Sequence, residues 1–206
     1  MILVIDVGTT SLRAAIVDGD GRIVRLERRE LPPSSPAPGL VEFDPTEMGR
    51  VVLEAATALL ADARTEGIAD ITAVGVTTQR ASAVVWDRAT GRAIGPGLGW
   101  QDLRTVGECI TAKIEHGVAI APNQTVTKAA WLLANAVPDG ADVCIGTVDS
   151  WIVWLLSEGA LHVTDDPDAD PEDGEPTPDA RGADQQWFDD EEPETTAQLV
   201  EPDDAD

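Results

Sequence analysis

The chain has 206 residues, of which 43% are hydrophobic, and a formal net charge of -24. That length suits one buried core with or without a tail. The acidity is uneven, because residues 165–206 carry 18 acidic residues against one basic residue, whereas residues 1–164 carry 20 against 13. A body so mildly acidic, without clustered Lys and Arg, offers no electrostatic basis for binding nucleic acid.

Targeting signals and disulfides are not expected. The apolar start, residues 1–7, is too short for a signal peptide and lacks a basic flank, and no apolar run is long enough to span a bilayer. Cys109 and Cys144 stand far apart without metal-ligand spacing, which favours reduced thiols. These features predict a soluble, cytoplasmic protein with no membrane partner.

The predicted elements begin with three strands, residues 2–7, 12–17 and 22–28, connected by a turn and a hairpin loop. A helix follows from Asp44, which can cap it, with Glu47 at the capping-box position. Further strands are expected at 71–77, 83–86 and 143–145, and further helices at 105–115, 126–135 and 148–156. A meander followed by alternating strands and helices predicts a single α/β domain with a mixed sheet, in the order of a ribonuclease H-like domain.

The periodic pattern ends near residue 165. The remaining segment contains six prolines among its acidic residues, and its apolar residues are too sparse to offset the entropy of ordering. We therefore expect a domain over residues 1–164 and a disordered, acidic, Pro-rich tail over residues 165–206.

A phosphate-binding turn is predicted where the first strand ends. Hydroxyls and amides in a short turn form a concave anion site, and Gly8 lets the backbone approach a ligand closely. Asp6 could hold Mg²⁺ through water, and Arg13 could neutralise phosphate charge. The candidate residues are Asp6, Gly8, Thr9, Thr10, Ser11 and Arg13. An ordinary β-turn with a surface Arg is the competing interpretation.

Two further clusters suit a sugar. Gln79 and Arg80 follow a predicted strand, at the edge where ligands gather in open α/β sheets. Trp100 precedes Gln101 and Asp102, which places an apolar platform beside polar groups. Each cluster has a structural alternative: an ion-paired surface Arg for the first, and a core Trp beside a helix-capping Asp for the second.

Other polar residues give weaker signals. Thr147 and Asp149 open a predicted helix, where capping is the expected role. His116 and His162 have no Cys or carboxylate partner nearby in the sequence, so no metal site formed by direct ligation is predicted.

Together these motifs give the chain a strong resemblance to the amino-terminal domain of FGGY carbohydrate kinases, within that family to the glycerol kinase branch. The matching stretches are 6–13, 38–45, 76–80, 85–91, 100–105, 127–133, 146–151 and 162–165. The resemblance covers nearly the whole region expected to be ordered, and the order and spacing of the motifs are specific.

The resemblance implies two actin-like, ribonuclease H-like domains that close on a cleft, of which this chain has the first. It implies ATP with Mg²⁺ as cofactors and a small sugar or polyol as substrate. Residues 8–11 and Arg13 would meet the ATP phosphates, and Gln79, Arg80, Trp100, Gln101, Asp102 and Asn123 would surround the substrate. The catalytic base of the family is an Asp at the start of the second domain. Asp184 is only a very weak candidate for that base, so the catalytic residue is unknown.

The chain departs from the family pattern at informative positions. Ala81 stands where glycerol kinases have Glu after the Gln-Arg pair, and Asn123 stands near the place of their substrate-binding Tyr. Both differences weaken glycerol as the substrate. The residues after Asp165 do not follow the family pattern.

Three hypotheses follow. The first is an ATP-dependent carbohydrate kinase whose activity in this chain alone is uncertain, because half of the cleft is absent. The second is a non-catalytic polyol-binding or regulatory module that pairs with a separate second domain or with itself. The third is halophilic adaptation, against which the mild charge of residues 1–164 argues.

Overall fold

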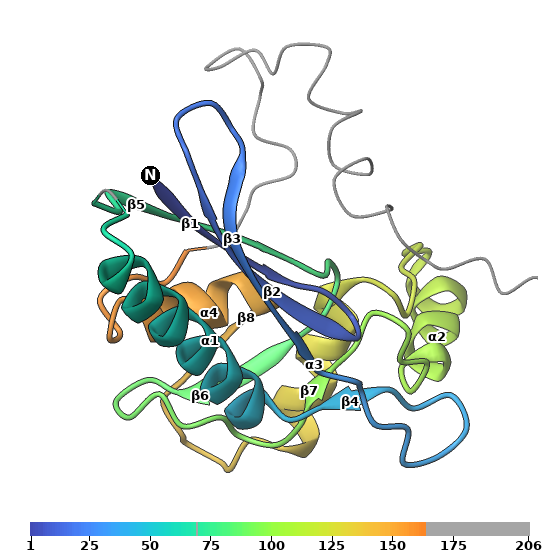
Figure 1. Ribbon diagram of the computed structural model, residues 1–206. Coiled ribbons are helices and arrows are strands. Elements are labelled where there is room, and N and C mark those ends of the chain that lie inside the picture. The colour runs from blue at the N-terminus through green and yellow to red at the C-terminus, as the bar shows by residue number, and fades with distance from the viewer. Residues whose placement is uncertain (69, 164–206) are drawn as a thin grey trace, which may run out of the picture. The chain divides into compact units, whose positions relative to one another are not determined.

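The computed structural model describes residues 1–68 and 70–163. The strands β1 (Ile2–Val7), β2 (Ser11–Val17) and β3 (Ile23–Glu30) form an antiparallel meander, and β5 (Ala73–Thr78) pairs in parallel with β1. The order β3-β2-β1-β5 gives the mixed sheet that the sequence predicted (Figure 1). Its parallel pair matters for the site, because the carboxyl ends of β1 and β5 lie side by side.

The helix α1 (Pro45–Thr65) runs along one face of the meander (Figure 1). The Asp44 carboxylate accepts hydrogen bonds from the amides of Thr46 at 2.8 Å and Glu47 at 3.2 Å, which confirms the predicted cap. The Glu47 side chain does not complete a capping box, because it binds Arg50 instead.

The core lies between α1 and the sheet. Alternate residues of β1 are buried, namely Leu3, Ile5 and Val7, as the period of two in a strand requires. The buried face of α1 contributes residues at helical spacing, Met48, Val52, Ala55 and Leu59. Burial of this apolar surface is the main force that fixes the sheet against the helix.

The later strands pair outside the four-stranded sheet. β6 (Val84–Asp87) is antiparallel to β8 (Val143–Gly146), and the two-residue strands β4 (Glu42–Phe43) and β7 (Gly97–Leu98) pair with each other. The sequence did not predict β4 and β7, because a two-residue strand has no alternation to recognise. It also did not show that β6 and β8 form a separate ribbon.

Three more helices complete the described structure. α4 (Val148–Leu156) contacts β5 and α1, and α3 (Thr125–Asn135) contacts β6. Trp86 of β6 packs against Trp151 and Trp154 of α4, with ring centroids 5.3 and 6.2 Å away. α2 (Val106–His116) buries only Cys109. None of these described helices combines the length and apolarity that crossing a bilayer needs.

Both described cysteines are buried free thiols. Burial, the largest influence, raises the pKa of the Cys144 thiol. The predicted tail, with Asp184, lies outside the described residues, so the domain boundary at residues 164 and 165 stays a prediction.

Candidate functional site

A cavity of about 240 Å³ opens beyond the carboxyl ends of β1 and β5. The two strands stay in register to their last residues, where Val7 lies opposite Thr78, and the Gln79 amide donates to the Val7 carbonyl at 2.8 Å. Six residues line the cavity: Thr9, Gln79, Arg80, Ala81, Trp100 and Asn123. Five of them are predicted site residues, drawn from four separate segments of the chain.

Thr9 connects the predicted phosphate turn to the predicted sugar cluster. The Trp100 indole Nε1 donates a hydrogen bond to Thr9 Oγ1 at 3.2 Å, across 91 positions of sequence. Trp100 is 42% exposed, so it is not the core residue of the competing interpretation. The indole therefore stands at the cavity as an accessible aromatic surface.

Arg80 is the charged residue of the cavity lining. Its side chain is exposed, and among residues 1–68 and 70–163 no carboxylate lies within ion-pair distance of it. The interpretation of Arg80 as an ion-paired surface residue thus finds no support in this part of the chain.

The backbone beside Arg80 is held in an unfavourable conformation. Ala81 has φ 57°, in the left-handed region that costs a residue with a Cβ about 1 kcal/mol. Its neighbour Ser82 is fully buried, and its hydroxyl has no hydrogen-bond partner in the described part of the chain. Strained backbone and unpaired buried polar groups are concentrated at ligand sites, where the surrounding structure enforces them.

The turn at residues 8–11 has the geometry of an anion site. The Gly8 amide donates to the Ser11 carbonyl at 2.9 Å, and a Cβ at Gly8 would lie 3.2 Å from that oxygen. Within the described residues, no hydrogen bond occupies the amides of Thr9 and Thr10. Two adjacent unoccupied amides at a strand end are the donors that a phosphate needs.

Asp6 and Arg13 form an ion pair beside this turn. They lie opposite each other in the β1–β2 register, with Arg13 Nη1 2.9 Å from Asp6 Oδ2. Their side chains are 20% and 25% exposed, so the pair is accessible to a ligand at the turn.

Asp102 lies behind the cavity lining and is fully buried. Its carboxylate accepts hydrogen bonds from the Val41 amide at 2.7 Å and from the Arg104 guanidinium at 2.7 and 2.9 Å. Arg104 also binds Glu42 at 2.6 Å and lies over the Trp131 ring. This geometry gives Asp102 a structural role in fixing the Trp100 loop. The exposed Gln101 is not among the six lining residues either.

The pKa of the Asp102 carboxyl reflects this environment. Burial alone would raise it, but the hydrogen bonds from the Arg104 side chain and from the amides of Val41 and Arg104 outweigh burial, so the pKa lies below its ordinary value. The carboxylate is therefore charged throughout the neutral pH range.

Lys128 is a buried residue that the sequence reasoning did not select. It is fully buried, and its Nζ donates to the Pro122 carbonyl at 2.6 Å and to the Gln124 carbonyl at 3.5 Å. These two carbonyls flank Asn123, and the Thr127 hydroxyl also donates to Gln124 at 2.9 Å. Burial lowers the pKa of Lys128, against a smaller opposing influence of the Asp102 charge. Lys128 thus holds the loop that carries Asn123.

The remaining candidates lie apart from the cavity lining. The His162 ring packs against Trp86 at 5.2 Å with its Nε2 3.2 Å from the Ile145 carbonyl, and His116 ends α2. Thr147 is the N-cap of α4, but its hydroxyl meets the Ser150 hydroxyl at 3.3 Å and not a helix amide. No three His, Cys, Asp or Glu side chains gather in a metal-binding group among the residues that the structure describes.

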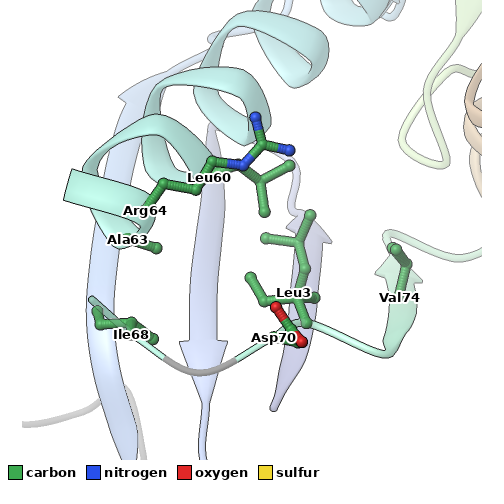
Figure 2. A pocket seen from close by; sticks show the side chains of 8 residues that line it. Leu3, Leu60, Ala63, Arg64, Ile68, Asp70 and Val74 are labelled. Carbon is green, nitrogen blue, oxygen red and sulfur yellow. The ribbon is translucent and has the colours of Figure 1, made fainter. Parts of the chain in front are cut away.

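A second cavity, of about 400 Å³, lies at the opposite end of the sheet. Figure 2 shows Leu60, Ala63 and Arg64 of α1 facing Leu3 and Val74, which lie near the amino ends of β1 and β5. Its lining is mainly aliphatic, and none of the predicted site residues belongs to it. The smaller cavity at the carboxyl ends is therefore the better candidate site.

Comparison with known proteins identifies the family of the chain. Residues 1–171 match the model of the FGGY family of carbohydrate kinases, N-terminal domain. The chain is 38% identical over 179 residues to a glycerol kinase of Methylobacterium nodulans and 40% identical over 180 residues to one of Ralstonia nicotianae. Each alignment covers 80% of this chain and 36% of the relative, so the chain spans about a third of these proteins' length.

Solved kinase structures have a similar fold. A Plasmodium falciparum glycerol kinase, solved with ADP, superposes with a TM-score of 0.64 at 24% identity, over 77% of this chain and 35% of that one. This likeness confirms the mixed α/β fold of the actin-like kinases that the sequence predicted. The family match, the relatives and the fold agree, and the chain belongs to the FGGY family of carbohydrate kinases, whose N-terminal domain it carries.

Proposed function

We propose that this chain forms one wall of a carbohydrate kinase active site, where a sugar or polyol lies in the cavity and ATP phosphates lie against the turn at residues 8–11. The observation that carries the proposal is the hydrogen bond between Thr9 and Trp100. It joins the phosphate turn to the sugar cluster, so the transferred phosphoryl group and the accepting hydroxyl would meet at one place.

The cavity has the chemistry of a polyol site. The Trp100 indole offers a face on which a carbon chain can lie, while Arg80, Gln79 and Asn123 present groups that bind hydroxyls. The cavity volume of about 240 Å³ suits a small polyhydroxylated molecule. Asp102 would support this wall from behind without touching the substrate.

The residues of the turn fit ATP with Mg²⁺. The unoccupied amides of Thr9 and Thr10 would donate to phosphate oxygens, and the absence of a Cβ at Gly8 keeps the turn tight. Asp6 would meet the hydrated cation, with its carboxylate oriented by Arg13. Bound Mg²⁺ supplies charge neutralisation at the phosphates. This chain's own part is to position the phosphates beside the substrate.

Transfer itself is proposed to need a further element. In the family, the base that takes the proton from the attacking hydroxyl belongs to a second domain, and the chain spans 36% of the length of its glycerol kinase relatives. We therefore expect residues 1–163 to bind and position the ligands, and transfer to need the groups of a second domain as well, since the cleft must also exclude water.

Ligand-induced stabilisation tests the proposal. The unfolding midpoint of the chain should rise with a saturable dependence on a small polyol or sugar acid, because a ligand that binds only the native state adds RT ln(1 + [L]/Kd) to its stability. Trp100→Ala should abolish the rise. Arg88→Ala, which alters an exposed ion pair with Asp142 on the β6–β8 ribbon, should leave it unchanged.

Two outcomes would contradict the proposal. One is no stabilisation by any polyhydroxylated compound, from three to six carbons, at 100 mM. The other is stabilisation that survives Trp100→Ala in full, because the ligand would then bind elsewhere.

A further inference from the structure

The charge of the cavity points to a narrower class of substrate. Of its six lining residues, Arg80 is cationic, and the other five, namely Thr9, Gln79, Ala81, Trp100 and Asn123, are neutral. The described residues place no carboxylate in the lining and none within ion-pair distance of Arg80. This wall of the site therefore carries one positive charge among the described residues.

The charges behind the lining do not cancel this charge. Behind the loops that carry Trp100 and Asn123, the carboxylates of Asp102 and Glu42 pair with Arg104, and Lys128 also interacts electrostatically with Asp102. At the turn, Asp6 is balanced by Arg13. The uneven acidity of the chain belongs mostly to residues 165–206. Arg80 is thus the uncompensated charge of the site among the described residues.

A cation that binds a neutral polyol gains only hydrogen bonds to hydroxyls. A carboxylate would give Arg80 a charge-assisted and bidentate pair, which is roughly twice as strong as a neutral hydrogen bond. Asn123 and Gln79 still offer amides, and Trp100 still offers an apolar face, for the rest of a hydroxylated chain. An anionic head with a hydroxylated body is complementary to this lining.

We propose that the preferred substrate is a short polyhydroxy acid, whose carboxylate pairs with Arg80 and whose hydroxylated chain lies along Trp100 and Asn123. Ala81 is the residue that determines this preference. It lines the cavity directly beside Arg80. An acidic side chain at this position would neutralise the Arg80 guanidinium. The methyl group of Ala81 instead leaves that charge, and the space next to it, available to a ligand. This inference rests on the proposed function, since it assigns the ligand of the same cavity.

The test compares acids with their matched neutral polyols on the full chain. Titration calorimetry at pH 7.5 and fixed ionic strength would measure the Kd of D-glycerate against glycerol and of D-gluconate against sorbitol. We expect the acid of at least one pair to bind tenfold to a hundredfold more tightly, as a hydrogen bond to a charged partner predicts. Inorganic phosphate, at the same concentration, should bind at least tenfold more weakly than that acid.

Two variants of Ala81 separate charge from size. Ala81→Glu supplies the absent carboxylate and should reverse the preference, so that the neutral polyol binds more tightly than the acid. Ala81→Gln has nearly the same volume without the charge, and it should keep the preference for the acid. Both residues have a Cβ, so both meet the same left-handed backbone as Ala81.

The outcomes distinguish this inference from the proposed function. Equal binding of acid and neutral polyol, abolished in both cases by Trp100→Ala, would overturn the inference and leave the polyol site standing. Phosphate that binds as tightly as the best acid and competes with that acid would also overturn it, because the cavity would then be a phosphate site. If neither member of any pair binds, the proposed function falls, and the inference falls with it.

Discussion

The two sides of the cavity are held in place by different forces. The strand wall, consisting of Thr9, Gln79, Arg80 and Ala81, follows directly from the ends of β1 and β5 and is fixed by their backbone ladder. The loop wall, consisting of Trp100 and Asn123, stands on irregular segments. Buried polar side chains behind it, Asp102, Arg104 and Lys128, hold those segments.

The loop wall is the more vulnerable side of the site. A backbone ladder tolerates most side-chain substitutions, because its hydrogen bonds do not depend on the identity of the residue. A buried network depends on each partner, since the removal of one leaves the other desolvated and unpaired. We therefore expect single polar substitutions to damage the loop wall far more than the strand wall.

The largest effect should come from Asp102→Asn. Loss of the carboxylate leaves the buried Arg104 without its main partner, and breaking a buried pair in this way costs about 3–5 kcal/mol of unfolding free energy. Urea unfolding would measure it. Asp142→Asn is the matched control, because it breaks a pair whose side chains are 52% and 78% exposed, and it should cost less than about 1 kcal/mol. Equal costs would refute the distinction between the two walls.

The same carboxyl should make the loop wall sensitive to acid. The folded pKa of Asp102 is lowered, so its stabilisation is fully present above the unfolded pKa of about 3.9 and is lost as the pH falls through the lower folded value. Unfolding free energies measured from pH 7 to pH 2.5 should therefore fall more steeply for the native chain than for Asp102→Asn. Parallel curves for the two proteins would show that a group other than Asp102 governs the loss of stability at low pH.

Lys128→Met should impair binding more than stability. The substitution stabilises the folded state because a charged ammonium group no longer has to be buried. It also destabilises the folded state because the Pro122 carbonyl loses its hydrogen-bond donor. Each of these opposing effects on the unfolding free energy is about a few kcal/mol. Ligand affinity should fall about tenfold, because the loop that carries Asn123 loses its anchor. Lys113→Met, at the chain's other lysine, is the control and should change neither quantity.

Ala81→Gly should stabilise the chain by about 0.5–1 kcal/mol, since glycine adopts a positive φ without the steric cost of a Cβ. Thermal unfolding would measure the gain. Glu158→Gly replaces the other described non-glycine residue with positive φ and should give a similar gain away from the cavity. A loss of stability in Ala81→Gly would mean that the methyl group packs in a way that offsets the backbone cost.

The smallest effect should come from Thr9→Val, which removes the acceptor of the Trp100 indole proton at 3.2 Å. One hydrogen bond at a half-exposed position contributes about 0.5 kcal/mol, the low end of the usual range, because water can replace it. The indole N–H of Trp100 should exchange faster with solvent in nuclear magnetic resonance spectra, while global stability changes little. Thr10→Val alters an exposed neighbour and should leave that exchange rate unchanged.

The two walls also differ in how far the sequence predicts them. A run of aliphatic residues predicted β1, and a capping signal predicted the start of α1. The strand-end positions of Thr9 and Arg80 followed from that pattern. Burial at single positions is a property of tertiary packing. Lys128 has the sequence appearance of a solvated helix residue, and Asp102 that of a helix cap or sugar ligand, so their burial could not be predicted.

Long-range pairing escaped prediction for a related reason. β6 and β8 are separated by more than fifty residues, and no local signal specifies that they pair with each other and not with the main sheet. The same holds for the contact between Thr9 and Trp100. The motifs predicted that both residues belong to one site, but they did not predict the hydrogen bond between them.

We propose that this kinase domain binds its substrate in the cavity between Thr9, Arg80, Trp100 and Asn123. A titration of the isotope-labelled chain with D-glycerate and with glycerol, followed in ¹⁵N-resolved spectra, tests it most directly. We expect saturable shifts of the Trp100 indole and of the Thr9, Arg80 and Asn123 amides. Shifts that instead gather around Leu3, Leu60 and Val74, or no saturable shifts at all, would contradict it.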